Sequence, residues 1–164
     1  MSKADKIILG FDPGFADTGW GVILKSTGSL KCIDAGNIQT SKKKEFFERL
    51  QIIYREANKL IRKYNPDIIA VEKLYFAKNV KTALDVGQAR GVLLLAVAES
   101  KKEIFEFTPL QVKQAVCSHG QASKNQVGLM VKTILNLNEV PKPDDVADAL
   151  AVAITASFFN KKLS

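Results

Sequence analysis

Residues 6–12 read KIILGFD, a run of apolar side chains that ends in a single acid, Asp12. A continuous apolar run of this length is typical of a strand covered on both faces, so we expect it near the centre of a sheet. Residues 67–72, DIIAVE, repeat the pattern and end in Glu72. If the two strands are adjacent and parallel, both acids emerge at the same edge of the sheet, where ligand sites of α/β proteins lie.

The rest of the sequence predicts further strands and helices. Short turns connect the first strand to strands at 18–26 and 30–40, which favours antiparallel neighbours. Pro13 and Gly14 suit the two central positions of a type II turn after the first strand. Helical spacing of apolar residues predicts a long helix over 43–64. A fifth strand is expected at 103–108, and further helices at 79–100, 109–117, 123–136 and 144–159.

This order of elements favours an α/β fold with a mixed five-stranded sheet and helices on both faces. The length fits a single domain over residues 1–164, large enough for a proper core. The net charge of +7 favours a polyanionic partner such as nucleic acid, although a solvated basic surface would give the same balance.

Cysteine use and hydropathy suit the cytoplasm. Cys32 and Cys117 form neither a metal-ligand pair nor a disulfide framework, as is usual in a reduced compartment. No apolar stretch reaches the roughly 18 residues of a membrane span, and the first apolar run is too short for a signal peptide. We therefore expect a cytoplasmic protein without a membrane partner.

Four acids in three separate segments are the candidate chemistry: Asp12, Glu72, Asp145 and Asp148. Asp145 and Asp148 are spaced i, i+3 on a predicted helix and share a face of it. Asp144 and Asp148, spaced i, i+4, share a face too, so spacing alone does not choose between Asp144 and Asp145. Mg²⁺ prefers such hard oxygen ligands, and two ions about 4 Å apart can hydrolyse phosphodiesters. Each acid also has a structural alternative, as a turn residue, a helix cap or an exposed strand end.

Four segments then carry a specific resemblance: ILGFDPGFADTGWGV (8–22), IIAVEKLYFAKNVKTALDVGQARGV (68–92), LQVKQAVCSHGQASKNQV (110–127) and DDVADALAVAI (144–154). Through them the chain resembles the RuvC-type Holliday-junction resolvases, the crossover junction endodeoxyribonucleases of the ribonuclease-H-like superfamily. The resemblance implies a ribonuclease-H-like fold and paired symmetric nicks in four-way DNA junctions, leaving 5′-phosphate ends, in recombination and repair. It also implies two Mg²⁺ ions per active site as cofactor, with Mn²⁺ as a substitute, a homodimer, and a branch-migration helicase as partner.

The family's catalytic residues transfer to this chain by motif. The metal-binding acids correspond to Asp12, Glu72, Asp145 and Asp148. The segment ADALA (147–151) places Asp148 in the motif, and the family's other acid three residues earlier, which favours Asp145 over Asp144. Lys113 and Lys124 match lysines near the family's active site, where they could position the scissile phosphate or stabilise transition-state charge. The alternative for each lysine is a solvated surface charge.

Further residues are candidates for DNA contact. An aromatic side chain can stack on an unpaired base near the crossover, and Tyr75 and Phe76 lie just after Glu72. The family typically has phenylalanine at the position of Tyr75, and Phe76 could instead belong to the core. Cations that flank this strand and the next helix could guide the DNA strands; they are Lys73, Lys78, Lys81 and Arg90.

The helix predicted over 79–100 carries Ala83, Gly87 and Gly91 at four-residue spacing. Small residues allow another backbone to approach closely, either the sheet or a second protomer. The resemblance implies that this helix helps to form the dimer, and two symmetric nicks need two sites related by a two-fold axis.

Three other functions remain compatible with the sequence. A related ribonuclease-H-like nuclease would cut RNA or linear DNA. A nucleotide-binding domain of the actin and sugar-kinase type also has a DxG turn followed by a TG pair, as Asp12, Gly14, Thr18 and Gly19 do here. A junction-binding architectural protein would bind without cutting, although the complete set of acids argues against it.

Overall fold

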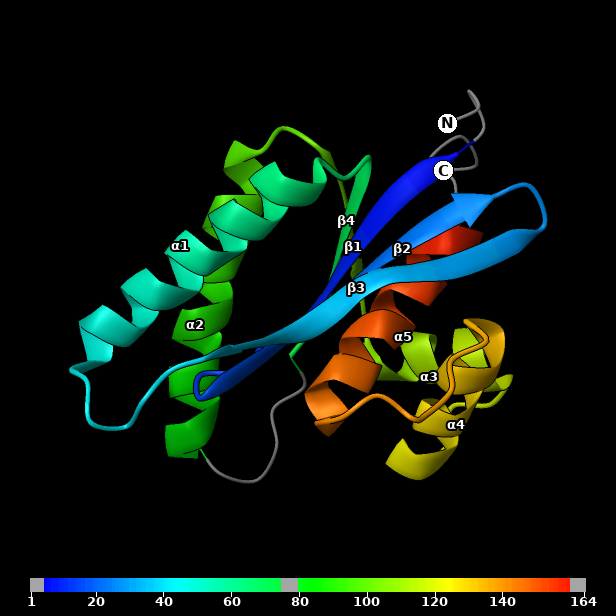
Figure 1. The fold of residues 1–164 in the computed structure, drawn as a ribbon. Helices are drawn as coiled ribbons and strands as arrows, with labels where there is room; N and C mark the ends of the chain where they lie inside the picture. Colours follow the sequence, from blue (N-terminus) through cyan, green and yellow to red (C-terminus); the bar gives the residue numbers. More distant parts are fainter. Residues whose placement is uncertain (1–4, 75–79, 160–164) are drawn as a thin grey trace.

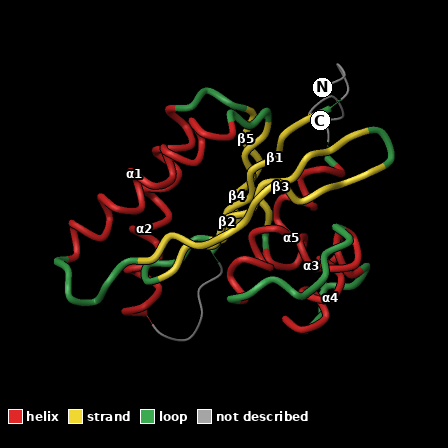
Figure 2. Tube along the Cα trace, in the orientation of Figure 1, coloured by secondary structure: helices red, strands yellow, loops and turns green. Residues whose placement is uncertain are grey.

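A five-stranded sheet lies between two layers of helices in the computed structural model, which describes residues 5–74 and 80–159 (Figure 1). In chain order the elements are β1 (Lys6–Asp12), β2 (Asp17–Ser26), β3 (Ser29–Gln39), α1 (Phe46–Tyr64), β4 (Ile68–Glu72), α2 (Val80–Glu99), β5 (Glu103–Phe107), α3 (Pro109–Cys117), α4 (Lys124–Ile134) and α5 (Asp144–Phe158). Figure 2 shows α1 and α2 on one side of the sheet and α3, α4 and α5 on the other.

The strand order is β3-β2-β1-β4-β5, so β1 is central as expected. β1 is antiparallel to β2 and parallel to β4. The parallel pairing runs from Ile8 opposite Ile68 to Phe11 opposite Val71, and it brings the last residues of both strands to one edge. The predicted adjacency of the two acid-terminated strands is therefore confirmed, as is the mixed sheet.

The two faces of β1 pack into separate cores. Leu9 and Phe11 are fully buried in the core that α1 and α2 form, whereas Ile8 is buried in the core that contains α5. Because successive side chains of a strand point to opposite faces, Asp12 lies on the same face as Ile8 and Gly10, toward α5. Burying each large apolar side chain stabilises the fold by roughly 1.5–3 kcal/mol, so β1 is held firmly from both sides.

The helix ends follow from local capping. Glu45 and Glu48 form a capping box, so α1 begins at Phe46 and not at 43. Asn65 ends the helix in the left-handed region, with φ of 42°. The other predicted elements agree with the observed ones to within about two residues at each end.

The turn after β1 differs from the expected one. Gly14 does not have the positive φ that its place in a type II turn requires, so that prediction was wrong. Glycine is needed there for space, because a Cβ would lie 1.9 Å from the carbonyl oxygen of Asp17. The Thr18 hydroxyl donates a hydrogen bond of 2.7 Å to the Gly14 carbonyl and closes this tight loop beside Asp12.

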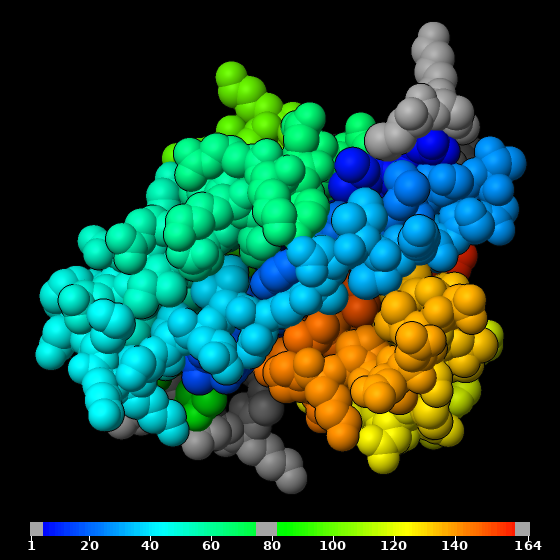
Figure 3. All heavy atoms as spheres, in the orientation of Figure 1, coloured from blue at the N-terminus to red at the C-terminus, as the bar shows by residue number. Residues whose placement is uncertain are grey.

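The edge strand β3 lies at the surface of the molecule (Figure 3). In Figure 3, β2 and β3 form a band of blue atoms between the two helical layers. None of the helices within residues 5–74 and 80–159 combines the length and apolar character that crossing a membrane needs.

Candidate active site

Three acids and two lysines line one cleft of about 270 Å³ at the carboxyl ends of β1 and β4. Asp12 and Glu72 are the last residues of these strands, and Asp148 lies in the N-terminal half of α5. Lys113 of α3 and Lys124 of α4 complete the charged lining. The apolar part of the wall consists of Pro109, Val112 and Val127.

Asp145 lies one turn before Asp148 on α5 and does not line this cleft. Its charge nevertheless helps to raise the pKa of Asp12, so the two carboxylates are close enough to repel. Burial also raises the pKa of Asp145 itself. Asp144 is exposed to solvent, and the structure therefore favours Asp145 as the acid beside the site.

Glycines on β1 and β2 bring α5 into contact with the sheet backbone. Gly10 pairs with Gly21 across the two strands, and Asp12 pairs with Gly19. A Cβ at Gly10 would lie 2.3 Å from the carbonyl oxygen of Ala149, and one at Gly21 would lie 2.5 Å from the side chain of Leu150. At these glycine positions a side chain would collide with the helix, so α5 packs closely there and holds its acids above the end of β1.

Burial and mutual repulsion dominate the electrostatics of the two strand-end acids. Burial, then the charges of Glu72, Asp148 and Asp145, raise the pKa of Asp12 well above its ordinary value. Burial raises the pKa of Glu72 to about 7, although a hydrogen bond from Asp12 and the nearby lysine charges oppose the rise. Near neutral pH and without a cation, this pair therefore retains a proton.

Lys124 offsets part of the repulsion. Its ammonium group lies 3.4 Å from the Asp148 carboxylate, and this neighbour raises the pKa of Lys124. Ser123 caps the start of α4 in a capping box, which places Lys124 on the first turn of the helix. Burial raises the pKa of Asp148, and the Lys124 charge lowers it again. The lysine therefore favours the charged form of the acids.

The donor set fits a hard divalent cation. In the described part of the chain, no three acidic, histidine or cysteine side chains already stand at metal-ligating distances from one point. The acids around the cleft nevertheless offer only oxygen ligands, which Mg²⁺ and Mn²⁺ prefer. A bound cation would also replace the proton that Asp12 and Glu72 retain and would relieve their repulsion.

The structure places only some of the candidate DNA contacts. Lys73 is exposed at the end of β4, where its amide donates a hydrogen bond to the Phe107 carbonyl. The guanidinium of Arg90 is occupied by Glu106 and by the carbonyl oxygen of Glu72, so it does not extend into solvent as a free cation. Tyr75, Phe76, Lys78 and the side chain of Lys81 lie outside the described residues.

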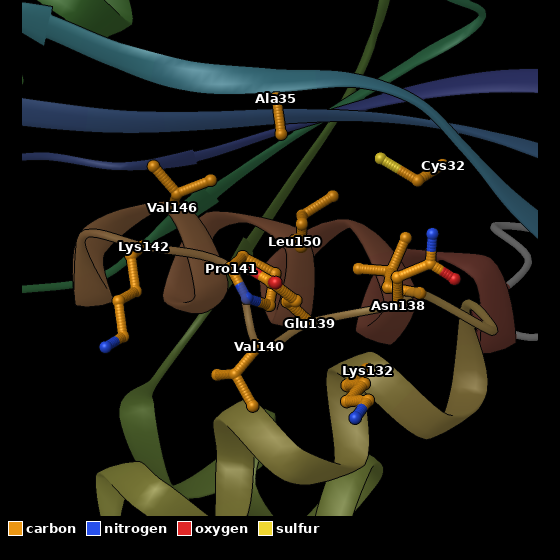
Figure 4. Close-up of a pocket in the computed structure, with 11 residues that line it drawn as sticks. Cys32, Ala35, Lys132, Asn138, Glu139, Val140, Pro141, Lys142, Val146 and Leu150 are labelled. Atoms are coloured by element: carbon orange, nitrogen blue, oxygen red, sulfur yellow. The ribbon is translucent and has the colours of Figure 1, made fainter.

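A larger hollow, of about 820 Å³, lies between β3 and the loop that precedes α5 (Figure 4). Cys32 and Ala35 line it from the strand, and Val146 and Leu150 line it from the helix. None of the predicted site residues is part of its lining, so size alone does not identify the active site.

Two structural features beside the site escaped the analysis of the sequence. The glycines Gly10, Gly19 and Gly21 alternate along two strands, and this spacing was the available signal for a helix packed against one face. Arg90 was expected on the DNA-binding surface, and only the fold brings its side chain to the backbone of Glu72.

Comparison with known proteins agrees with this geometry. The family model for "Crossover junction endodeoxyribonuclease RuvC" matches residues 8–156. The enzyme of that name from Halothermothrix orenii is 57% identical over 148 residues, which cover 90% of each chain.

Solved structures extend the comparison to the fold. The structure of Thermus thermophilus RuvC is 35% identical, with a TM-score of 0.83 and 93% of each chain covered. The structure of T. thermophilus RuvC in complex with a Holliday junction substrate is 32% identical, with a TM-score of 0.84 and the same coverage. The fold is therefore ribonuclease-H-like, and the chain belongs to the RuvC family of crossover junction endodeoxyribonucleases.

Proposed function

We propose that this chain resolves four-way DNA junctions by metal-dependent hydrolysis, with paired symmetric nicks that leave 5′-phosphate ends. The observation that carries the proposal is the convergence of Asp12, Glu72 and Asp148 with two lysines in one cleft. Membership of the RuvC family supports the reaction, and the junction bound to the T. thermophilus relative supports the substrate. A single domain would carry the whole site of each protomer.

The acids of the cleft, together with Asp145, would hold two Mg²⁺ ions, and Mn²⁺ would be accepted as a substitute. Such ions supply a water activated for attack and stabilise the leaving oxygen. The raised pKa values of Asp12 and Glu72 support this role, because a cation is the natural counterion for a buried acidic pair.

The two lysines would act on the DNA phosphate. Lys113 and Lys124 line the same cleft as the acids, so a scissile phosphate held there would lie beside both cations. Lys124 also balances the charge of Asp148 at 3.4 Å, and its charge lowers the pKa of that carboxylate, which favours the ionised form that binds a metal.

The flanking residues would guide the junction. Lys73 is exposed beside the end of β4, which supports a contact with a DNA phosphate. Phosphate contacts by Lys78 and Lys81 and base stacking by Tyr75 and Phe76 remain predictions from the sequence.

A homodimer would provide two active sites, one for each nick. The exposed face of α2 supports the formation of such a dimer. Leu84 and Leu95 are 62% and 54% exposed. Added Cβ atoms at Gly87 and Gly91 would meet no described atom within 4 Å, so these glycines are not explained by packing on the sheet. A groove lined partly by Leu95 continues this apolar surface between α1 and α2. We assign the surface to a second copy of the chain.

Two further expectations stay with the proposal. A branch-migration helicase would act with the dimer on the same junction, and the protein would work in the cytoplasm.

The testing experiment uses a labelled mobile four-way junction and a linear duplex of matched sequence. Wild type and Asp148→Asn are incubated with each in Mg²⁺, Mn²⁺ or EDTA. Paired nicks in the junction alone, absent in EDTA and in the variant while junction binding persists, are the expected result. Equal cutting of the duplex would favour a less selective nuclease, and binding without cleavage in either metal would favour an architectural protein.

A further inference from the structure

Arg90 reaches from α2 to the strand end that carries Glu72. Its Nε donates a hydrogen bond of 3.2 Å to the main-chain carbonyl oxygen of Glu72. Its Nη2 forms an ion pair with Glu106, a residue of the neighbouring strand β5. The Arg90 side chain is 19% exposed, so its hydrogen bond to the Glu72 carbonyl is partly shielded from water, whereas the ion pair with Glu106 lies at the surface.

The Glu72 carbonyl lies where the regular pairing of the sheet stops. The last pair of β4 and β5 is Glu72 with Phe107. The Lys73 amide donates to the Phe107 carbonyl, so in the alternating parallel pattern the Glu72 carbonyl points away from β5 and toward β1. A continued ladder with β1 would draw its next donor from residue 13, but Pro13 has no N–H. Arg90 therefore supplies a donor where the chain after β1 offers none.

Arginine suits this position better than lysine would. Its planar guanidinium presents several N–H donors in a fixed fork and can bind a carbonyl and a carboxylate together. Lysine would offer a flexible point charge, which cannot reproduce both directions. The Glu72 contact is made to the main chain, so the carboxylate itself stays available to the cleft.

We propose that Arg90 is a positioning residue for the reaction: it fixes the main chain at Glu72, and thereby the direction in which that carboxylate enters the cleft. Glu106 orients the guanidinium by the ion pair. This inference rests on the proposed role of Glu72 as a metal ligand, and it replaces the expected contact between Arg90 and DNA.

The test compares Arg90→Gln, Arg90→Lys and Glu106→Gln in the full chain. Arg62→Gln removes the same charge from the exposed face of α1 and serves as the matched control. Three quantities are measured for each: the single-turnover rate of junction cleavage against Mg²⁺ concentration, the junction affinity in EDTA, and the Mn²⁺ affinity without DNA by electron paramagnetic resonance. Circular dichroism checks that each variant is folded.

Arg90→Gln is expected to lower the cleavage rate and the Mn²⁺ affinity by about tenfold to a hundredfold, as usual when support for a metal ligand is lost. Its junction affinity should stay within about twofold of wild type, because the proposed contact is internal. Arg90→Lys and Glu106→Gln should have cleavage rates and Mn²⁺ affinities between those of wild type and Arg90→Gln. These two variants also test the inference if Arg90→Gln fails to fold.

Two outcomes would overturn the inference. In one, the Arg90 variants keep the wild-type metal dependence; in the other, they lose junction affinity with metal affinity unchanged, as expected of a DNA contact. A wild type that binds Mn²⁺ but cuts no junction would count against the proposed function alone, since the Mn²⁺ affinities still test Arg90. A wild type that binds no Mn²⁺ would overturn both.

Discussion

Gly19 lies directly beneath the backbone of Asp145: a Cβ built on the glycine would stand 1.9 Å from the Asp145 carbonyl oxygen and 3.1 Å from its Cβ. Gly19 is also the residue that pairs with Asp12 across β1 and β2. One glycine therefore separates the acid at the end of a central strand from the first turn of α5. The spacing between two proposed metal ligands depends on the absence of a single methyl group.

Gly19→Ala should push the start of α5 away from the sheet. The contact is with main-chain atoms, which cannot rotate aside, so the free energy of unfolding should fall by roughly 1–3 kcal/mol. Cleavage should fall by at least about tenfold because the acids separate. Urea denaturation and single-turnover cleavage measure the two effects. Gly120→Ala is the control, since its nearest obstacle is the flexible end of the Leu110 side chain; equal effects would remove any special role for Gly19.

Asp145→Asn and Asp144→Asn form a matched pair on the first turn of α5. Asp145 influences the pKa of Asp12, whereas Asp144 is exposed, so only the first substitution should lower cleavage, by about a hundredfold or more. Both variants should bind the junction as wild type does. A larger loss from Asp144→Asn, in single-turnover cleavage at saturating Mg²⁺, would reverse the assignment.

Stability without metal should depend on pH through Glu72. Its pKa in the folded protein is about 7, above its ordinary value, so the unfolded chain releases this proton at lower pH. The stabilising contribution is therefore complete below about pH 4.5 and is lost as pH rises toward 7, on the order of 3 kcal/mol in total. Urea denaturation in EDTA across this range should show the decline.

Two comparisons isolate that contribution. Glu72→Gln cannot ionise at this position, so its decline should be shallower than that of wild type. Mg²⁺ bound to the deprotonated acids, as proposed, should offset the loss above neutral pH. A wild-type decline that persists unchanged in Glu72→Gln would mean that another group is responsible.

Lys124→Ala should shift the pH dependence of cleavage upward. The Lys124 charge lowers the pKa values of Glu72, Asp145 and Asp148, so without it all three ionise at higher pH. The rate should therefore reach half of its plateau at higher pH than in wild type. Lys59→Ala, on the exposed face of α1, is the control for loss of a positive charge. If Lys124 serves only to bind phosphate, the profile will stay in place and the salt dependence of binding will decrease instead.

Much of the fold could be predicted because its signals are local. The apolar runs of β1 and β4, the helical spacing in α1 and the acids at the strand ends are all visible in short windows of sequence. The start of α1 was misplaced by three residues because the capping box of Glu45 and Glu48 was not recognised, although the apolar residues at helical spacing begin only at Phe46.

The rest depends on contacts between distant segments. The choice between Asp144 and Asp145 follows from how α5 lies on the sheet, which the helical spacing of the two acids leaves open. The proposed role of Arg90 requires the end of β4, the proline after β1 and the position of α2 together. The predicted stacking of Tyr75 and Phe76 falls outside the described residues and stays a prediction.

The site draws Asp12 from β1 and Asp148 from α5, the first and last elements in chain order. During synthesis, a ribosome-bound chain can display Asp12 and Glu72 well before the acids of α5 have emerged. Such a chain also lacks the helix that covers the glycine face of β1, so the cleft has neither its full charge nor its wall. The proposed site therefore cannot be complete in an unfinished nascent chain, and it forms only after translation has delivered α5.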